Sequence, residues 1–207
     1  MTDNAYFRTS DPALLDVVGY KLNPEWWSRP YEYAWALGHA RGLGQVADMG
    51  CGWMDRPLRH GLALYCEMVY AVDADPRVMQ LPNPTPQHLR HIVGDFARGP
   101  IASIGEGELD AVFCVSVLED LSGVKLETAL DTFVYHLRPG GRIYLTFDVL
   151  TGKKIMYPGL DFSAFETACR RAGVWYAGEV DYKLPPDALR HDGWNLACFH
   201  ALLEVKE

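Results

Sequence analysis

The chain has 207 residues, of which 49% are hydrophobic and 12% aromatic, so it can bury one core of good size and is not a disordered chain. Its 27 acidic residues outnumber its 19 basic ones and give a formal net charge of −8. This acidity disfavours a protein held to nucleic acid by a general basic surface, so we expect nucleic acid not to be a partner.

Targeting signals and cysteine usage indicate the compartment. The N-terminus lacks a basic stretch followed by an apolar one, and no apolar run approaches the ~18 residues of a spanning helix, so we expect no secretory signal and no membrane span. The five cysteines are scattered without CxxC spacing, which predicts a reduced, cytoplasmic protein without a zinc or other metal site. Cys114, Cys169 and Cys198 lie in apolar runs and are expected in the core.

Residues 1–42 contain two expected helices and the aromatic-rich stretch PEWWSRPYEYAW. Trp27, Tyr31 and Trp35 recur every four residues and therefore share one face of a helix. This spacing fits either core packing or a lid over an acceptor, and both interpretations stay open. We expect this segment to cap the acceptor side of a single domain that spans residues 1–207.

Residues 43–150 alternate short apolar runs with helical or irregular connections. The apolar runs are QVADMG, MVYAVDAD, HIVGD, LDAVFCVSV and RIYLTFD. Leu126, Leu130 and Phe133 follow helical spacing and predict a helix over residues 126–137. This alternation predicts an α/β fold with a buried, mostly parallel sheet.

Residues 151–207 continue with a different pattern. DFSAFETACRRAG predicts a helix that ends at Gly173, and VWYAGEVDYKL and NLACFHALLEV predict two strands. We expect these strands to form an antiparallel hairpin, with a connection long enough to carry His191 over a site.

Glycines and acids follow the predicted strands, where open parallel sheets bind ligands. Gly50 and Gly52 let a ligand approach the backbone, and Asp73 suits a pair of ribose hydroxyls. Asp48 would repel a diphosphate, and Asp55 stands where the dinucleotide fingerprint needs its third glycine. A nicotinamide-dependent oxidoreductase is therefore the weaker alternative.

The chain resembles the class I S-adenosylmethionine-dependent methyltransferases. VADMGCG, VYAVDADP, HIVGDF, LDAVFCVSVLEDL and LRPGGRIYLTF match the five motifs of that family in order, between residues 46 and 148. SRPYEYAWAL also resembles a segment of bacterial methyltransferases found near surface-polysaccharide genes. The resemblance implies a Rossmann-like, doubly wound, mostly parallel seven-stranded sheet with a C-terminal antiparallel hairpin.

The resemblance also implies S-adenosylmethionine as the cofactor and a set of residues that hold it. Asp48 would organise the loop of Gly50, Cys51 and Gly52 around the methionine part, and Arg29 would meet its carboxylate. The remaining contacts would be Asp73 with the ribose, Ala74, Asp95 and Phe96 with the adenine, and Val115 and Ser116 as the floor of the site. Cys51 is interpreted as a small residue beside the cofactor rather than as a nucleophile.

The chain departs from the family pattern at two places. Glu119–Asp120 stands where the family often has Glu-His, and Trp53–Met54 replaces smaller residues. The first departure removes a ready imidazole base, which leaves Asp120, His191 or Asp148 as candidate catalytic bases.

We therefore predict a methyltransferase that acts on a small molecule or saccharide-type acceptor by O- or N-methylation, as a monomer or homodimer. The alternative is a catalytically silent, methyltransferase-like subunit that binds the cofactor or a protein partner.

Overall fold

The computed structural model describes residues 3–53, 57–80 and 86–205. Met54 and Asp55, on which part of the sequence argument rests, lie outside these residues.

Five parallel strands form the centre of the main sheet. They are β4 (Gln45–Met49), β5 (Met68–Asp73), β6 (Leu89–Val93), β7 (Leu109–Val115) and β8 (Leu137–Leu150). Their order in space is β8-β7-β4-β5-β6, and each neighbouring pair is parallel. The chain builds β5 and β6 on one side of β4 and then β7 and β8 on the other, so the strand order reverses between β4 and β7. Ligands of open α/β sheets bind at the carboxyl ends of the strands beside such a reversal.

The C-terminal strand β11 (Leu196–Val205) runs antiparallel along β8 from Leu196↔Leu150 to Glu204↔Arg142. β1 (Ala5–Tyr6) continues the sheet, so the path β1-β11-β8-β7-β4-β5-β6 has seven strands. This confirms the predicted doubly wound, mostly parallel sheet. Two further short strands, β9 (Val174–Tyr176) and β10 (Arg190–His191), also pair with β11.

The first strand of the predicted C-terminal hairpin is much shorter than expected. The sequence predicted a strand over residues 174–184, but only β9 pairs with β11, opposite Leu203–Val205. β1 pairs with Phe199 and His200 and so takes the next part of the β11 edge. The Asn4 side chain donates to the carbonyl oxygens of Ala177 and Glu179, and Asp181 forms a bridge to Ala5, so the chain beyond Ala177 lies against the N-terminal segment.

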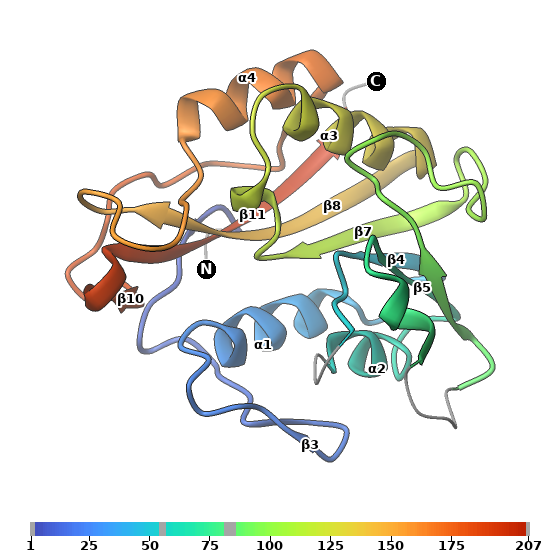
Figure 1. The fold of residues 1–207 in the computed structure, drawn as a ribbon, viewed down its shortest axis with the longest axis horizontal. Helices are drawn as coiled ribbons and strands as arrows, with labels where there is room; N and C mark the ends of the chain where they lie inside the picture. Colours follow the sequence, from blue (N-terminus) through green and yellow to red (C-terminus); the bar gives the residue numbers. More distant parts are fainter. Residues whose placement is uncertain (1–2, 54–56, 81–85, 206–207) are drawn as a thin grey trace.

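Helices cover both faces of the sheet. α1 (Arg29–His39) and α2 (Leu58–Leu62) lie on one face, and α3 (Val124–His136) and α4 (Phe162–Ala172) lie on the other (Figure 1). The Asp161 carboxylate accepts from the Ala164 N–H at the start of α4, and Gly173 ends that helix at φ +72°. The predicted helices over residues 126–137 and in DFSAFETACRRAG are confirmed as α3 and α4.

Only one of the two helices expected in residues 1–42 is present among the described residues 3–42, and it is α1. The segment before it forms β1 and a small antiparallel sheet of β2 (Asp16–Val17) and β3 (Tyr20–Lys21). Val18 and Gly19 have positive φ values of 55° and 83°, and the Asp16 carboxylate accepts from the Gly19 N–H at 2.7 Å. This turn chemistry overrides the helical pattern.

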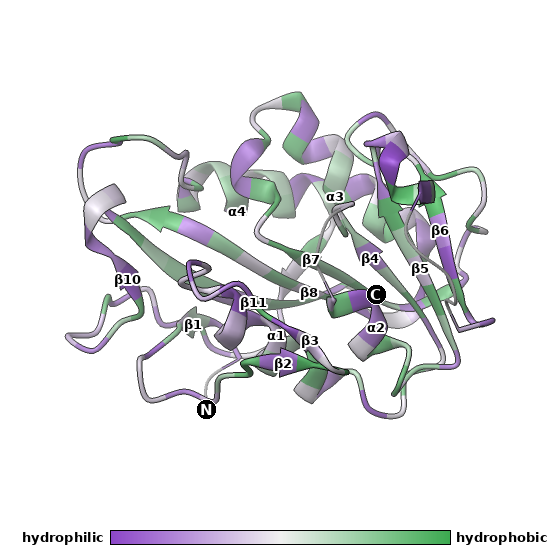
Figure 2. Cartoon of the chain, turned by 60° about the horizontal axis from the view of Figure 1, so that its bottom comes forward, coloured by the Kyte–Doolittle hydropathy of each residue, from purple (hydrophilic) through white to green (hydrophobic). Residues whose placement is uncertain are grey.

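The sheet separates two layers of core, because alternate residues of each strand face opposite sides. Along β7, Phe113 packs with the α1 and α2 side, whereas Val112 and Cys114 pack with the α3 and α4 side. Hydrophobic residues line most of the strands between the helix layers (Figure 2). Cys114, Cys169 and Cys198 are all buried, as the sequence predicts.

Candidate functional site

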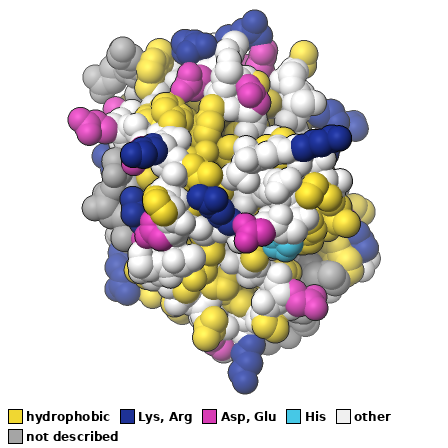
Figure 3. All heavy atoms as spheres, turned by 90° about the vertical axis from the view of Figure 1, so that its left-hand side faces the viewer, with side chains coloured by type: hydrophobic (Ala, Val, Ile, Leu, Met, Phe, Trp, Pro, Cys, Tyr) yellow, Lys and Arg dark blue, Asp and Glu magenta, His cyan; other side chains and the backbone are white. Residues whose placement is uncertain are grey.

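A cleft of about 560 Å³ lies at the carboxyl ends of the central strands. Residues from the ends of β4, β5, β7 and β8 line it, and the segment that precedes α1 closes one side. Figure 3 looks at the molecule from the side toward which β8 points, and hydrophobic and charged side chains are interspersed over this face. The cleft therefore lies at the reversal of strand order between β4 and β7.

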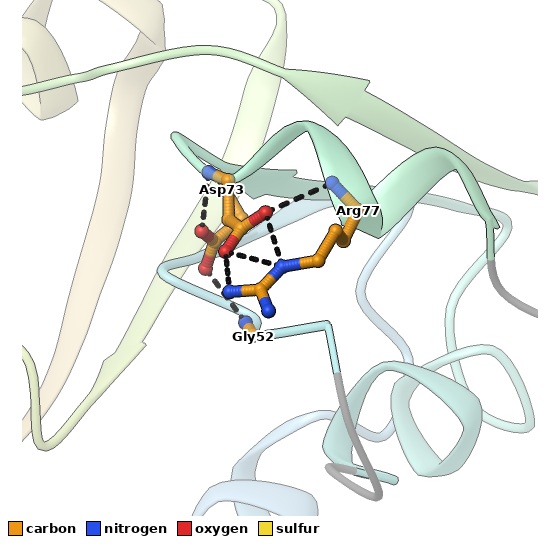
Figure 4. A network of polar contacts seen from close by, with 4 residues as sticks. Gly52, Asp73 and Arg77 are labelled. Atoms are coloured by element: carbon orange, nitrogen blue, oxygen red, sulfur yellow. Dashed lines mark hydrogen bonds and ion pairs between the residues drawn. The ribbon is translucent and has the colours of Figure 1, made fainter.

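The glycine loop after β4 forms one wall of the cleft. The Gly50 N–H donates to the Val72 carbonyl oxygen at 2.8 Å, and its φ is +81°. A Cβ at this position would lie 2.5 Å from Cγ2 of Val117, so both the backbone conformation and the space require glycine. The Gly52 N–H donates to Oδ2 of Asp73 at 2.8 Å, which joins the loop to the end of β5 (Figure 4).

Asp73 is held in a defined orientation. Its Oδ1 accepts from the Asp75 N–H at 2.9 Å, while Oδ2 accepts from Gly52. Each carboxylate oxygen can accept a second hydrogen bond, so both can still receive hydroxyl donors from a ligand.

Arg59 supports the glycine loop from α2 and was missed by the sequence analysis. Its buried Nη1 donates to the carbonyl oxygens of Cys51 at 3.1 Å and Gly52 at 2.9 Å. Its only sequence signal is a basic residue that follows the loop at the start of a helix. Burial, followed by the charge of Asp48, raises the pKa of the Cys51 thiol well above its ordinary value, so Cys51 carries no thiolate at neutral pH.

Trp53 lines the cleft, and its ring packs against the guanidinium group of Arg77. The Arg77 guanidinium stands 3.9 Å from the centroid of the Trp53 ring. Arg77 is itself paired with Asp75, with its Nε 2.9 Å from each carboxylate oxygen (Figure 4). The bulky residue of the loop is thus anchored by a cation–π contact.

An ion pair between Arg29 and the buried carboxylate of Glu32 lies at the cleft. Arg29, predicted to meet the cofactor carboxylate, lines the cleft and donates through Nη1 to Oε2 of Glu32 at 2.5 Å. Oε1 of Glu32 accepts from Ser116 Oγ at 2.6 Å and from Thr146 Oγ1 at 2.5 Å. Burial opposes ionisation of Glu32, but the Arg29 charge and the two hydroxyl donors outweigh it and hold its pKa below the ordinary value. The sequence analysis missed Glu32, whose one signal is its i,i+3 spacing from Arg29.

Two further acids line the cleft with an atom left unpaired. Glu119 Oε2 and Asp148 Oδ1 are buried and have no hydrogen-bond partner among the described residues. Burial, and then the negative charge of Glu32, raises the pKa of Asp148 to about 7. Burial, and then the charge of Asp148, raises the pKa of Glu119 well above its ordinary value. Perturbed carboxyl groups of this kind in a cleft are candidates for acid–base chemistry.

The other predicted site residues lie at different distances from the cleft. Gly50, Gly52, Asp73, Ser116 and Asp120 line it, as Arg29 does. Asp48, Cys51 and Val115 are buried beside it, and Ala74 is exposed on the bend after β5.

Asp95 and Phe96, predicted to contact adenine, lie elsewhere. Asp95 lines a separate hollow of about 310 Å³ and pairs with Arg98 at 2.9 Å. The Phe96 ring is buried and packs on Phe133, with centroids 5.3 Å apart. The cofactor roles assigned to the residues of the predicted site, these two included, stay predictions.

The aromatic residues before and within α1 were expected either to pack in the core or to form a lid over an acceptor, and they divide between these two places. Trp26 and Trp27 line the cleft, whereas Tyr33 is buried in the core and Trp35 packs against it. His191 stacks on Trp194 with ring centroids 3.6 Å apart, and its centroid lies 5.9 Å from that of Trp27. His191 thus contacts two indoles that line the cleft but is not itself among the described residues that line it. No cluster of three or more metal-ligating side chains occurs in the part of the chain that the structure describes.

One protein family matches part of the chain. Residues 47–145 match the model of the methyltransferase domain family, and this range covers the five sequence motifs almost completely. Residues 47–145 thus form a methyltransferase domain of the class I S-adenosylmethionine-dependent type. No curated protein sequence matches it significantly.

Solved structures of methyltransferases share the fold. A 1,6-didemethyltoxoflavin-N1-methyltransferase of Burkholderia thailandensis, with bound 1,6-didemethyltoxoflavin and S-adenosylhomocysteine, is 18% identical, with a TM-score of 0.65 over 89% of this chain and 80% of that one. The N-methyltransferase NodS of Bradyrhizobium japonicum, in complex with S-adenosylhomocysteine, is 17% identical, with a TM-score of 0.59 over 89% of each chain. A TehB-like methyltransferase of Corynebacterium glutamicum is 23% identical, with a TM-score of 0.60 over 85% of this chain and 88% of that one.

The methyl donor of this methyltransferase domain is S-adenosylmethionine. None of the helices in residues 3–53, 57–80 and 86–205 is long and apolar enough to cross a membrane.

Proposed function

We propose that this methyltransferase transfers the methyl group of S-adenosylmethionine to a hydroxyl or amino group of a small molecule or saccharide-type acceptor. The observation that carries the proposal is that one cleft joins the glycine loop after β4, the carboxylate at the end of β5, and two acids near the ends of β7 and β8. Each of these two acids has one buried oxygen without a hydrogen-bond partner in the described part of the chain. A cofactor and a small acceptor can therefore bind side by side.

The cofactor half of the cleft lies over β4 and β5. Asp73, fixed by the N–H groups of Gly52 and Asp75, can accept from the ribose hydroxyls with its remaining lone pairs. Gly50 and Gly52 let the methionine part lie against the backbone, because neither carries a Cβ. Arg29 has further N–H donors besides the one given to Glu32 and can meet the cofactor carboxylate.

The acceptor half lies over β7 and β8. Trp26 and Trp27 form one wall, and Tyr157 and Trp194 form another, with their rings 4.5 Å apart at the centroids. Aromatic walls present a large, rigid contact area to a flat or ring-shaped acceptor. The volume falls within the range of about 300–1,000 Å³ that is typical of small-molecule sites. The small-molecule acceptor of the toxoflavin enzyme, whose fold is shared, agrees with this size.

The reaction is an in-line displacement at the methyl carbon of the sulfonium. The protein positions the two reactants and excludes water, and a base is needed where the acceptor must lose a proton. Asp120 and Asp148 both line the cleft and are candidates, whereas His191 contacts Trp194 and Trp27 and is not among the described lining residues.

Isothermal titration with S-adenosylhomocysteine tests the cofactor site. We expect the chain to bind it at micromolar concentration, Asp73→Ala to lose most of that affinity, and Asp131→Ala on the exposed side of α3 to keep it. Absence of binding by the unmodified chain would overturn the proposal.

Turnover distinguishes the enzyme from a catalytically silent subunit. Labelled S-adenosylmethionine is incubated with pooled metabolites and glycans, and transfer of label to any acceptor excludes the silent subunit. A cytoplasmic location and a monomeric or homodimeric state are part of the proposal, and sedimentation analysis measures the second.

A further inference from the structure

Acidic side chains far outnumber basic ones among the described residues that line the cleft. Its described lining residues include six acids, Glu25, Asp73, Asp75, Glu119, Asp120 and Asp148, against one base, Arg29. Arg29 is neutralised by its ion pair with Glu32. On the cofactor side, Asp75 is neutralised by Arg77, and Asp73 is assigned to the ribose. The uncompensated acids are therefore concentrated on the acceptor side.

Two of these acids have an unsatisfied atom. Glu119 Oε2 and Asp148 Oδ1 are buried without a donor among the described residues, although both side chains line the cleft. A buried acceptor without a donor is costly and is rare in folded proteins unless a ligand or water supplies the hydrogen bond. The pair thus calls for a ligand that brings N–H or O–H donors into this end of the cleft.

The walls beside the two acids favour a positive charge on that ligand. Trp26, Trp27 and Trp194 line the cleft, and the face of an indole attracts a cation more strongly than any other aromatic side chain does. Lys153 and Lys154, which could have served an acidic acceptor, are exposed and are not among the residues that line the cleft. An anionic acceptor would meet repulsion here.

We propose that the acceptor is an amine, which binds as its ammonium ion between the carboxyl groups of Glu119 and Asp148 and the indole walls, and that Asp148 removes its proton before methyl transfer. The inference rests on the proposed function and names the substrate class of the same site.

The proposed steps balance in atoms and charge. The ammonium N–H bond breaks and its proton passes to the Asp148 carboxylate, which leaves a neutral amine with a free electron pair. This pair forms a bond to the methyl carbon, the carbon–sulfur bond breaks, and its electrons stay on sulfur. The products are the N-methylated ammonium ion and S-adenosylhomocysteine, and the carboxyl proton then leaves to water.

The surroundings of Asp148 suit it to this proton transfer. The groups that face it are Arg29 and Glu32 from α1, Glu119 and Asp120 from the turn after β7, and Cys198 from β11. Burial and the neighbouring negative charges give Asp148 a pKa of about 7, so the carboxylate is ionised at pH 8 and more basic than an ordinary one. The difference between the pKa of Asp148 and that of an aliphatic ammonium ion is therefore smaller, which makes the proton transfer less unfavourable.

Two probes of the same shape test the charge preference. 2-Phenylethylamine and 2-phenylethanol are titrated into the chain saturated with S-adenosylhomocysteine at pH 8. We expect the amine to bind at least about tenfold more tightly, which is about 1.4 kcal/mol. An amine that binds no more tightly than the alcohol, including the case in which neither binds, overturns the inference.

Variants identify the residues. Glu119→Gln and Asp148→Asn keep the side-chain shape, and we expect each to reduce the amine preference severalfold. Glu106→Gln and Asp131→Asn, at exposed positions, are matched controls and should preserve it. Equal loss in the controls would contradict the assignment.

A turnover assay supplies the catalytic readout. A panel of primary and secondary amines and the matching alcohols is incubated with labelled S-adenosylmethionine between pH 6 and 9. We expect label in at least one amine, with a rate that rises through pH 7 and loses this rise in Asp148→Asn. Label only in alcohols overturns the inference while the proposed function survives. Failure to bind S-adenosylhomocysteine defeats the proposed function itself.

Discussion

Replacing Asp148 by asparagine should stabilise the protein at alkaline pH. The folded-state pKa of this carboxyl group is about 7 against an ordinary value of 3.8, because burial and the charge of Glu32 disfavour its ionised form. A raised carboxyl pKa means that the folded state resists ionisation, so the resulting destabilisation is absent below the unfolded-state pKa. It grows between about pH 4 and pH 7 and is complete above that.

The size of this destabilisation follows from the shift in the pKa of Asp148. About three pKa units at 1.36 kcal/mol each give an upper limit of about 4 kcal/mol, and since the side chain is half-buried at the cleft we expect about 2 kcal/mol. Asparagine carries no charge and avoids this cost. At pH 8 Asp148→Asn should therefore raise the melting temperature by roughly 4–8 °C for a chain of this length.

Thermal denaturation at pH 5 and pH 8, without cofactor, measures the effect. At pH 5 about a third of the penalty has developed, so the gain should fall below about 1 kcal/mol. Asp131→Asn, on the exposed side of α3, is the control and should change little at either pH. If Asp148→Asn is destabilised at pH 8, or gains equally at both pH values, the carboxyl group is not the strained acid inferred from the structure.

The remaining predictions concern the loop, the ion pair of Arg29 and Glu32, and the thiols. Gly50→Ala forces a Cβ to within 2.5 Å of Val117 and should lower the free energy of unfolding, measured in urea, by at least about 1–3 kcal/mol. The second change Val117→Ala should recover part of this loss. Full wild-type stability of the single variant would count against the loop geometry. Glu32→Gln leaves the partly exposed Arg29 without its hydrogen-bonded counter-ion and should cost about 1.5–3 kcal/mol. A second change, Arg29→Gln, should reduce this loss, and denaturation midpoints of both variants decide the prediction. The native protein should not react with a thiol reagent at pH 8, because all five cysteines are buried and burial raises the pKa of the Cys51 thiol. Rapid labelling of the protein before urea is added would refute this.

Several parts of the site could be predicted from the sequence because they depend on local patterns. The run VADMGCG identifies a buried strand followed by glycines, and the structure shows why Gly50 has no alternative there. Asp73 follows the second strand, and parallel strands bring their carboxyl ends to one edge, so its meeting with the glycine loop follows from the fold class.

Other parts could not be predicted, because they join segments that are distant in the sequence. Glu32 accepts hydrogen bonds from Ser116 and Thr146, which are 84 and 114 positions away. The Phe96 ring turns into the core and packs on Phe133, a direction that the motif does not specify. The N-terminal residues compete for the β11 edge and shorten the predicted strand after Gly173, which a pattern read within one segment cannot show.

The sequence by itself determined the fold class and the succession of strands along the chain, which follow from hydrophobic periodicity. It also determined the methyl donor, through the resemblance of five ordered motifs to a known family. Only the tertiary structure decided the character of the acceptor end. It brings Glu119 from the turn after β7 and Asp148 from β8 into one cleft, where a buried oxygen of each has no donor within residues 3–53, 57–80 and 86–205. The charge cost of such an arrangement exists only when the two acids share one low-dielectric space, and folding alone creates that space.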